Sequence, residues 1–155
     1  MLWTEFTALL LLATAMSFTP GPNTALATAM AANAGLRHSL RFVLAVPVGW
    51  CLLLLLCSVG VGALVAQVPA LRWGIQLGGA ALQFVNIKAW FLALTIIAGW
   101  VAGQPNMGLR LGIVVPVMVF FAFSSNLTYA CLGAVLRHWL AQGQRLLWFN
   151  RGMAL

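Results

Sequence analysis

The stretch of this sequence best suited to chemistry is Ser17-Phe18-Thr19-Pro20-Gly21-Pro22-Asn23-Thr24, which interrupts an apolar N-terminal segment. Pro20 and Pro22 lack a backbone N–H, and their rings clash with a carbonyl one turn back, so a helix cannot run straight through them. Gly21 between them tolerates dihedrals that other residues avoid. Hydrocarbon cannot satisfy the backbone groups that such a break frees. The break is therefore tolerated only inside protein or beside a wet cavity.

A new half-helix is predicted to begin at Asn23 and Thr24, because both residue types are good N-caps. A helix N-terminus carries partial positive charge and open N–H donors, which suit a carboxylate. Broken helices of this kind are where transporters commonly bind their substrates. On these residues alone an alternative stays open, namely that Pro20–Pro22 only kinks or ends a membrane span.

The composition predicts an integral membrane protein with an all-α fold. The 155 residues are 63% hydrophobic and only 6% charged, whereas soluble domains carry roughly 25% charged residues. Glu5 is the single acidic residue, and eight Lys and Arg give a net charge of +7. These cations stand at segment ends without a basic face or base-stacking platform. They predict contact with the lipid bilayer and orientation by the positive-inside rule, with no nucleic-acid partner.

About four to five hydrophobic segments are expected to form a polytopic helix bundle. The loop Gly35–Arg41 is the strongest cytoplasmic marker in the N-terminal half, with Gly35 as a C-cap, and Gly103–Gly108 is a turn. The expected helical segments are Leu2–Met16, Thr24–Ala34, Phe42–Val68, Gly74–Val101 and Leu111–Leu136.

Polar residues inside these segments are further candidates for a site. Gln83, Asn86 and Lys88 precede a cleanly apolar stretch. A Lys at the centre of a membrane helix costs roughly 2.5 kcal/mol or more, so Lys88 either snorkels to an interface or lies in a polar cavity. Asn126 belongs to a polar patch with neighbouring Ser and Thr residues. Such a patch either joins helices by hydrogen bonds or lines a pathway.

The charges conflict with a simple count of four spans. If the loop with Arg37 and Arg41 is cytoplasmic, that count puts the turn before Arg110 inside and the arginine-rich tail outside, against the positive-inside rule. The conflict disappears if Gly74–Val101 crosses the membrane an even number of times, or enters it and returns on the same side. Two helical crossings need about 40 residues, more than this stretch has. A span is therefore expected to be missing.

The chain resembles the LysE/RhtB family of amino-acid exporters. The break at Pro20–Asn23, followed by Gly35-Leu36-Arg37, is similar to the family's N-terminal signature, and Asn86-Ile87-Lys88 is similar to its Asn-Pro-Lys motif with Ile87 in place of Pro. Members have six spans in two inverted repeats. The resemblance implies one membrane domain, with residues 1–82 from the first repeat and 83–155 from the second. Most of the third and sixth spans are expected to be absent.

The resemblance also implies a function and a site. It implies export of amino acids or related small metabolites across the bacterial inner membrane, driven by the proton gradient, without a cofactor or metal. The two motifs would face each other near mid-membrane. The half-helix N-terminus and Lys88 would bind the substrate carboxylate, and the broken backbone would supply carbonyls for its ammonium. The implied substrate-binding residues are Pro20, Gly21, Pro22, Asn23, Thr24, Gln83, Asn86, Lys88 and Asn126.

Two other classes of function stand beside this one. The chain could be a shortened, inactive or partner-dependent remnant of such a transporter, and its Gly-x-x-x-Gly sequences offer packing faces for a homo-oligomer. A membrane enzyme is disfavoured, because the sequence offers no nucleophile–base pair and no metal cluster. His38 and His138 are far apart in sequence and lie on predicted loops.

Overall fold

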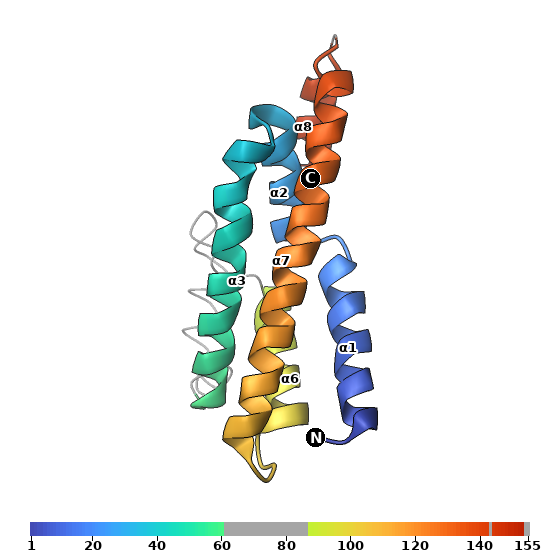
Figure 1. Cartoon of the computed structure of the whole chain (residues 1–155). Helices are drawn as coiled ribbons and strands as arrows, with labels where there is room; N and C mark the ends of the chain where they lie inside the picture. Colours follow the sequence, from blue (N-terminus) through green and yellow to red (C-terminus); the bar gives the residue numbers. More distant parts are fainter. Residues whose placement is uncertain (61–86, 143, 154–155) are drawn as a thin grey trace. The chain divides into compact units, whose positions relative to one another are not determined.

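The computed structural model describes residues 1–60, 87–142 and 144–153. Every regular element in this described part is helical, which confirms the all-α prediction (Figure 1). Two helices, α3 and α7, are long and apolar enough to cross a membrane, and two shorter helical stretches are also apolar. The elements are α1 Trp3–Phe18, α2 Pro22–Ala34, α3 Leu36–Ser58, α6 Ile87–Ile96, the π-helix η2 Ile97–Val101, α7 Met107–Leu140 and α8 Arg145–Met153.

The predicted helix break is confirmed. Helix α1 ends at Phe18 and α2 begins at Pro22 (Figure 1). The predicted N-cap is wrong, because Gly21 holds that position in extended geometry (φ −157°, ψ 178°). Pro22 follows as the first helical residue, where its missing N–H costs nothing and its fixed φ suits the helix. Asn23 and Thr24 therefore lie within the first turn.

The connection between α2 and α3 is a single residue, Gly35. Its φ of +87° confirms the predicted C-cap, and its N–H bonds to the carbonyl of Ala31 at 2.9 Å. The predicted loop Gly35–Arg41 is wrong beyond this residue, since α3 already begins at Leu36. A glycine in the left-handed region reverses the chain so sharply that no longer loop is needed.

The second half of the chain is more helical than predicted. The predicted turn is confirmed between η2 and α7, and it includes Asn106 at φ +59°. Helix α7 extends beyond the predicted Leu111–Leu136 at both ends, and Pro116 lies within it. Part of the predicted tail forms α8. The end of Phe42–Val68, the first part of Gly74–Val101 and the division of the repeats at residues 82 and 83 lie outside the described residues.

The chain divides into two compact units, to which α1, α3 and α7 each contribute residues. Unit 1 comprises Met1–Ala13 and Gly49–Val119, and unit 2 comprises Thr14–Val48 and Phe120–Leu155. Each is described by itself.

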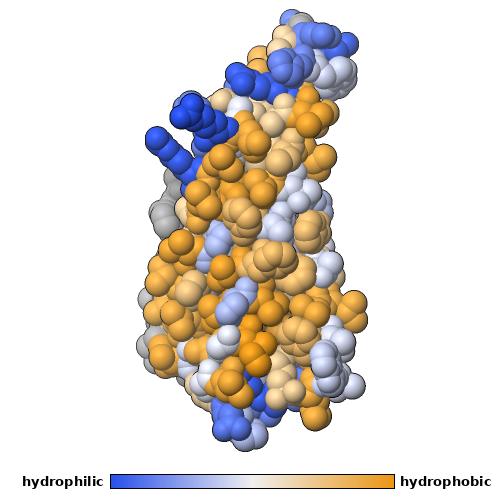
Figure 2. Space-filling view, viewed as in Figure 1, coloured by the Kyte–Doolittle hydropathy of each residue, from blue (hydrophilic) through white to orange (hydrophobic). Residues whose placement is uncertain are grey.

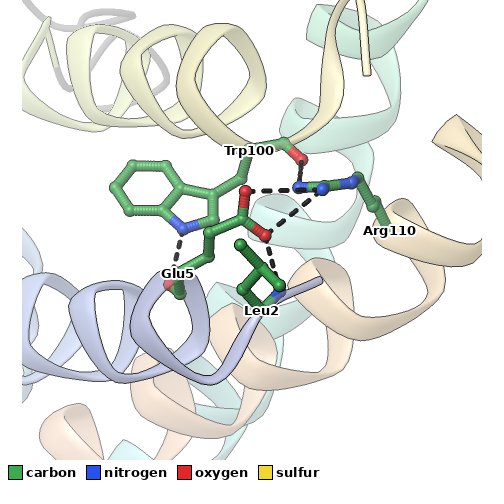
Figure 3. Close-up of polar contacts among 4 residues, drawn as sticks. All are labelled: Leu2, Glu5, Trp100 and Arg110. Carbon is green, nitrogen blue, oxygen red and sulfur yellow. Dashed lines mark hydrogen bonds and ion pairs between the residues drawn. The ribbon is translucent and has the colours of Figure 1, made fainter. Parts of the chain in front are cut away.

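Unit 1 contains a polar cluster that joins the start of α1, η2 and the start of α7 (Figure 3). Nη2 of Arg110 lies 3.2 Å from Oε2 of Glu5, and Nη1 donates to the carbonyl of Trp100 at 3.2 Å. The indole N–H of Trp100 donates to the carbonyl of Glu5 at 2.8 Å, and the N–H of Leu2 donates to the Glu5 carboxylate at 2.8 Å. Arg110 is buried, with 7% of its surface exposed. The one acidic residue of the chain therefore neutralises a buried arginine.

The core of unit 2 is built from small residues. Ala27 and Ala31 of α2 pack with Val43 of α3 and Ala130 of α7, and all four side chains are fully buried. Small side chains let helix backbones approach closely, as is usual in membrane bundles. The hydroxyl of Ser39 donates to the carbonyl of Ala27 at 3.2 Å, which adds a polar link between α3 and α2.

The cations of unit 2 gather at one end. Helix α3 begins and α7 ends there, because the Arg137 guanidinium lies against Gly35. Helix α8 joins the same end through Asn33 and Asn150, whose side-chain amides exchange hydrogen bonds of 2.9 and 3.0 Å. Five of the chain's eight Lys and Arg residues belong to this unit, namely Arg37, Arg41, Arg137, Arg145 and Arg151.

The outward face of the long helices is apolar. Leu44, Val48 and Leu52 on α3 are 58%, 61% and 57% exposed, and Val135 on α7 is 76% exposed. Figure 2 shows hydrophobic side chains covering most of the visible face, with hydrophilic ones at the end where α8 lies and a second group at the bottom of the view. Exposed apolar area of this extent is what lipid contact requires.

Candidate functional site

The start of α2 is the predicted carboxylate site, and its capping bonds decide which N–H donors are left for a ligand. The hydroxyl of Thr24 accepts the N–H of Gly21 at 2.9 Å and donates to the Gly21 carbonyl at 2.9 Å. The first four N–H groups of a helix have no partner within it. Here Pro22 has none to offer and that of Gly21 is taken. The first-turn donors that α2 itself does not use are thus those of Asn23 and Thr24, at the positive end of the helix dipole.

The break is sheltered on one side by α7. The phenol of Tyr129 donates to the carbonyl of Phe18 at 2.9 Å, so a carbonyl at the end of α1 has a partner. The predicted residues differ in burial. Thr24 is buried, Gly21 and Asn23 are half-buried, and Pro20 and Pro22 are exposed. The prolines therefore shape the backbone, and the polar residues that follow them face inward.

Helices α7 and α2 pack so closely that their backbones are in contact near Gly133. A Cβ on Gly133 would lie 2.3 Å from the carbonyl oxygen of Thr28. The hydroxyl of Thr28 donates to the carbonyl of Thr24 at 2.8 Å within α2 and shares this proton with the carbonyl of Tyr129, 3.2 Å away. Tyr129 and Gly133 are the residues that motif reasoning missed as parts of the site. The sequence shows a tyrosine and a glycine four residues apart in an apolar helix. This spacing indicates a helix contact only when the position of α2 is known.

Asn126 lies one turn before Ala130 on α7 and is only 3% exposed. Its side-chain N–H donates to the carbonyl of Ala122 at 2.8 Å. Its Oδ1 is buried and has no hydrogen-bond partner among the described residues. Ser125 beside it is also buried, and its hydroxyl donates to the same Ala122 carbonyl at 3.4 Å. The predicted polar patch thus contains one acceptor that its own helix does not satisfy.

The second predicted motif is described only in part. Lys88 lies in the first turn of α6, is half-buried and belongs to unit 1. Gln83 and Asn86 lie outside the described residues. Pro20–Thr24 and Asn126 belong to unit 2. The predicted meeting of the two motifs near mid-membrane stays a prediction.

The chemistry open to this arrangement is binding. Within the described ranges, no group of three or more His, Cys, Asp or Glu side chains could hold a metal ion. The start of α2 combines unused N–H donors and a helix dipole with the buried amide oxygen of Asn126, which lies one turn before residues that contact α2. A helix start with such donors binds and orients an anionic group without transforming it.

Comparison with known proteins relates part of the chain to a family of membrane translocators. The family model described as LysE type translocator matches residues 14–90, which include the helix break, α2, α3 and the start of α6. No curated protein and no solved structure matches the chain. LysE-type proteins are membrane translocators and not enzymes. The match to residues 14–90, the all-α fold, the membrane-length helices and the interrupted first segment are together consistent with a member of the LysE type translocator family.

Proposed function

We propose that this protein exports amino acids or related small metabolites across the bacterial inner membrane, with the proton gradient as the driving force. The observation that carries the proposal is the start of α2. The N–H donors that α2 itself does not use follow a helix break, and a neighbouring helix bonds to one end of this break. A carboxylate on these donors would meet the positive end of α2. Lys88 would give a second positive partner in the same binding site.

Export can be measured in cells loaded with dipeptides, which release amino acids inside, or in proteoliposomes with radiolabelled amino acids. The half-buried side-chain amide of Asn23 would add a donor beside the backbone N–H groups, and Asn23→Ala removes this amide alone. We expect Asn23→Ala and Lys88→Ala each to lower export about tenfold while the protein still inserts normally. Loss of a hydrogen bond to a charged group costs about 1.5–3 kcal/mol, and 1.4 kcal/mol is a factor of ten. Thr128→Ala is the control, because this exposed hydroxyl bonds only within α7.

Unchanged export by both variants would remove these residues from the site. Absence of export by the wild type across a panel of amino acids would instead favour the alternative of an inactive or partner-dependent protein. Dissipating the proton gradient with an uncoupler tests the driving force separately, since a gradient-driven exporter then only equilibrates its substrate.

We also propose that the cationic end of unit 2 is cytoplasmic. The start of α3, with Arg37 and Arg41, and the end of α7, with Arg137, lie at the same end of this unit. The tail and the first cationic turn then obey the positive-inside rule together. The start of α7 would then lie on the opposite, periplasmic side.

This orientation predicts the outcome of cysteine labelling. In a background where Cys51, Cys57 and Cys131 are replaced by serine, a single cysteine at Pro105 should react with a membrane-impermeant maleimide in intact cells. A cysteine at Gln142 should react only after permeabilisation. Both positions are exposed and lie beyond opposite ends of α7. The reverse pattern of labelling would overturn the orientation.

A further inference from the structure

The side chain of Asn126 has a fixed orientation and an unused acceptor. Its Nδ2 donates to the Ala122 carbonyl at 2.8 Å, and this bond assigns the two ends of the amide because an oxygen could not donate there. The opposite end, Oδ1, is buried without a partner among the described residues. A buried acceptor left in this state is unfavourable, so it calls for a donor from outside the described side chains.

The contacts between α7 and α2 show which residues of α2 lie at the same height as Asn126. Thr28 bonds to the carbonyl of Tyr129 and lies against Gly133. Farther along both helices, Arg137 lies against Gly35. Both helices therefore advance in the same direction where they touch.

One turn earlier on each helix are Thr24 and Asn126. Thr24 precedes Ala27 and Thr28 on the face of α2 that meets α7, and Asn126 precedes Ala130, which packs against Ala27. Positions three or four apart share a helix face. Thr24 and Asn126 are 5% and 3% exposed, so both point into the protein interior. The unused oxygen of Asn126 thus lies level with the first turn of α2.

Two carbonyl groups of the helix break already accept hydrogen bonds from the protein, so they are less able to bind a ligand ammonium than the sequence suggests. The carbonyl of Gly21 already accepts the N–H of Ala25 at 2.8 Å and the hydroxyl of Thr24 at 2.9 Å, which uses both of its lone pairs. The carbonyl of Phe18 accepts the phenol of Tyr129. Asn126 Oδ1, by contrast, is an acceptor for which no described residue uses either lone pair.

We infer that Asn126 is a specificity-determining residue that accepts a hydrogen bond from the ammonium group of the exported compound, while the carboxylate of that compound lies on the first turn of α2. This inference rests on the proposed function and adds the role of one residue to it. The ligands it selects are small carboxylates that carry an N–H donor beside the acid group. Carboxylates of the same shape without that donor leave Oδ1 unsatisfied and bind less tightly.

The test uses purified protein in detergent and the rise in Tm on ligand addition, because a ligand that binds only the folded state stabilises it. Amino acids are compared with the same acids lacking the amino group, such as alanine with propionate and leucine with isocaproate. The wild type should be stabilised by at least one amino acid and not by its deamino partner. Asn126→Leu should reduce this discrimination about tenfold or more, as measured by apparent Kd. Asn126→Asp should keep or increase it, because a carboxylate also accepts from an ammonium.

Ser125→Ala is the matched control, since its hydroxyl is equally buried and bonds within α7. This variant should keep the wild-type discrimination. If Asn126→Leu fails to fold, Asn126→Asp decides alone, and a discrimination below that of the wild type overturns the inference. Equal discrimination by Asn126→Leu and the wild type, or no stabilisation of the wild type by any amino acid, also overturns it. Stabilisation by amino acids without measurable export contradicts the proposed function and leaves the inference standing.

Discussion

Replacing Gly133 with alanine is expected to unfold or severely destabilise unit 2. The new Cβ would lie 2.3 Å from the carbonyl oxygen of Thr28 and 3.0 Å from its carbonyl carbon and Cα. These are backbone atoms and cannot rotate away, so α2 has to separate from α7. Overpacking typically costs about 1–3 kcal/mol and occasionally more. The separation would also break the bond from Thr28 to Tyr129 and open the alanine core.

Gly112→Ala is the matched control for this prediction. It is in the same helix, and a Cβ there would meet nothing within 4 Å. Alanine is favoured over glycine inside a helix by about 1 kcal/mol, so this variant should be as stable as the wild type or slightly more so. The measurement is Tm in detergent by circular dichroism, with the yield of inserted protein. Equal stability of the two variants would show that α2 and α7 do not pack at Gly133.

Loss of the packing at Gly133 is also expected to weaken ligand binding. The register that places Thr24 and Asn126 at one level depends on the close approach at Gly133. Any Gly133 variant that still inserts should therefore lose stabilisation by ligand together with helix packing. The control at Gly112 should retain both.

Glu5→Gln is expected to lower Tm by more than the loss of both charged groups together. The variant leaves the buried guanidinium of Arg110 without its counter-charge, and its remaining acceptors are neutral, namely the Trp100 carbonyl and the new amide oxygen at position 5. Removing one member of a buried ion pair is strongly destabilising, whereas replacing both by groups of similar size is often neutral. The double variant Glu5→Gln, Arg110→Met should therefore recover part of the loss.

The coupling of Glu5 and Arg110 can be measured with a double-mutant cycle, in which Tm is compared for Glu5→Gln, Arg110→Met and their combination. Arg41→Gln serves as a control for removing a cation, because Arg41 is exposed near the start of α3. It should leave Tm near the wild-type value. Additive effects of the Glu5 and Arg110 variants would contradict a coupled pair.

The sequence alone determined much of this protein. Its composition is enough for a membrane protein, because so few charged residues cannot cover a soluble domain of this size. Two prolines flanking Gly21 are enough for a helix break, since the missing N–H groups and ring clashes act locally. Gly35 as a C-cap follows from the same local reasoning. These features depend on near neighbours in the chain, so they can be predicted without knowledge of the fold.

Other features depend on segments far apart in sequence, and only the tertiary structure decided them. The N-cap at Gly21 instead of Asn23 is an exception, because it follows from local contacts: Pro22 fits the first helical position and the Thr24 hydroxyl bonds back to the cap. The close approach at Gly133 and the ion pair of Glu5 with Arg110 each join residues about a hundred positions apart. No local pattern encodes such pairs, because packing alone brings them into contact.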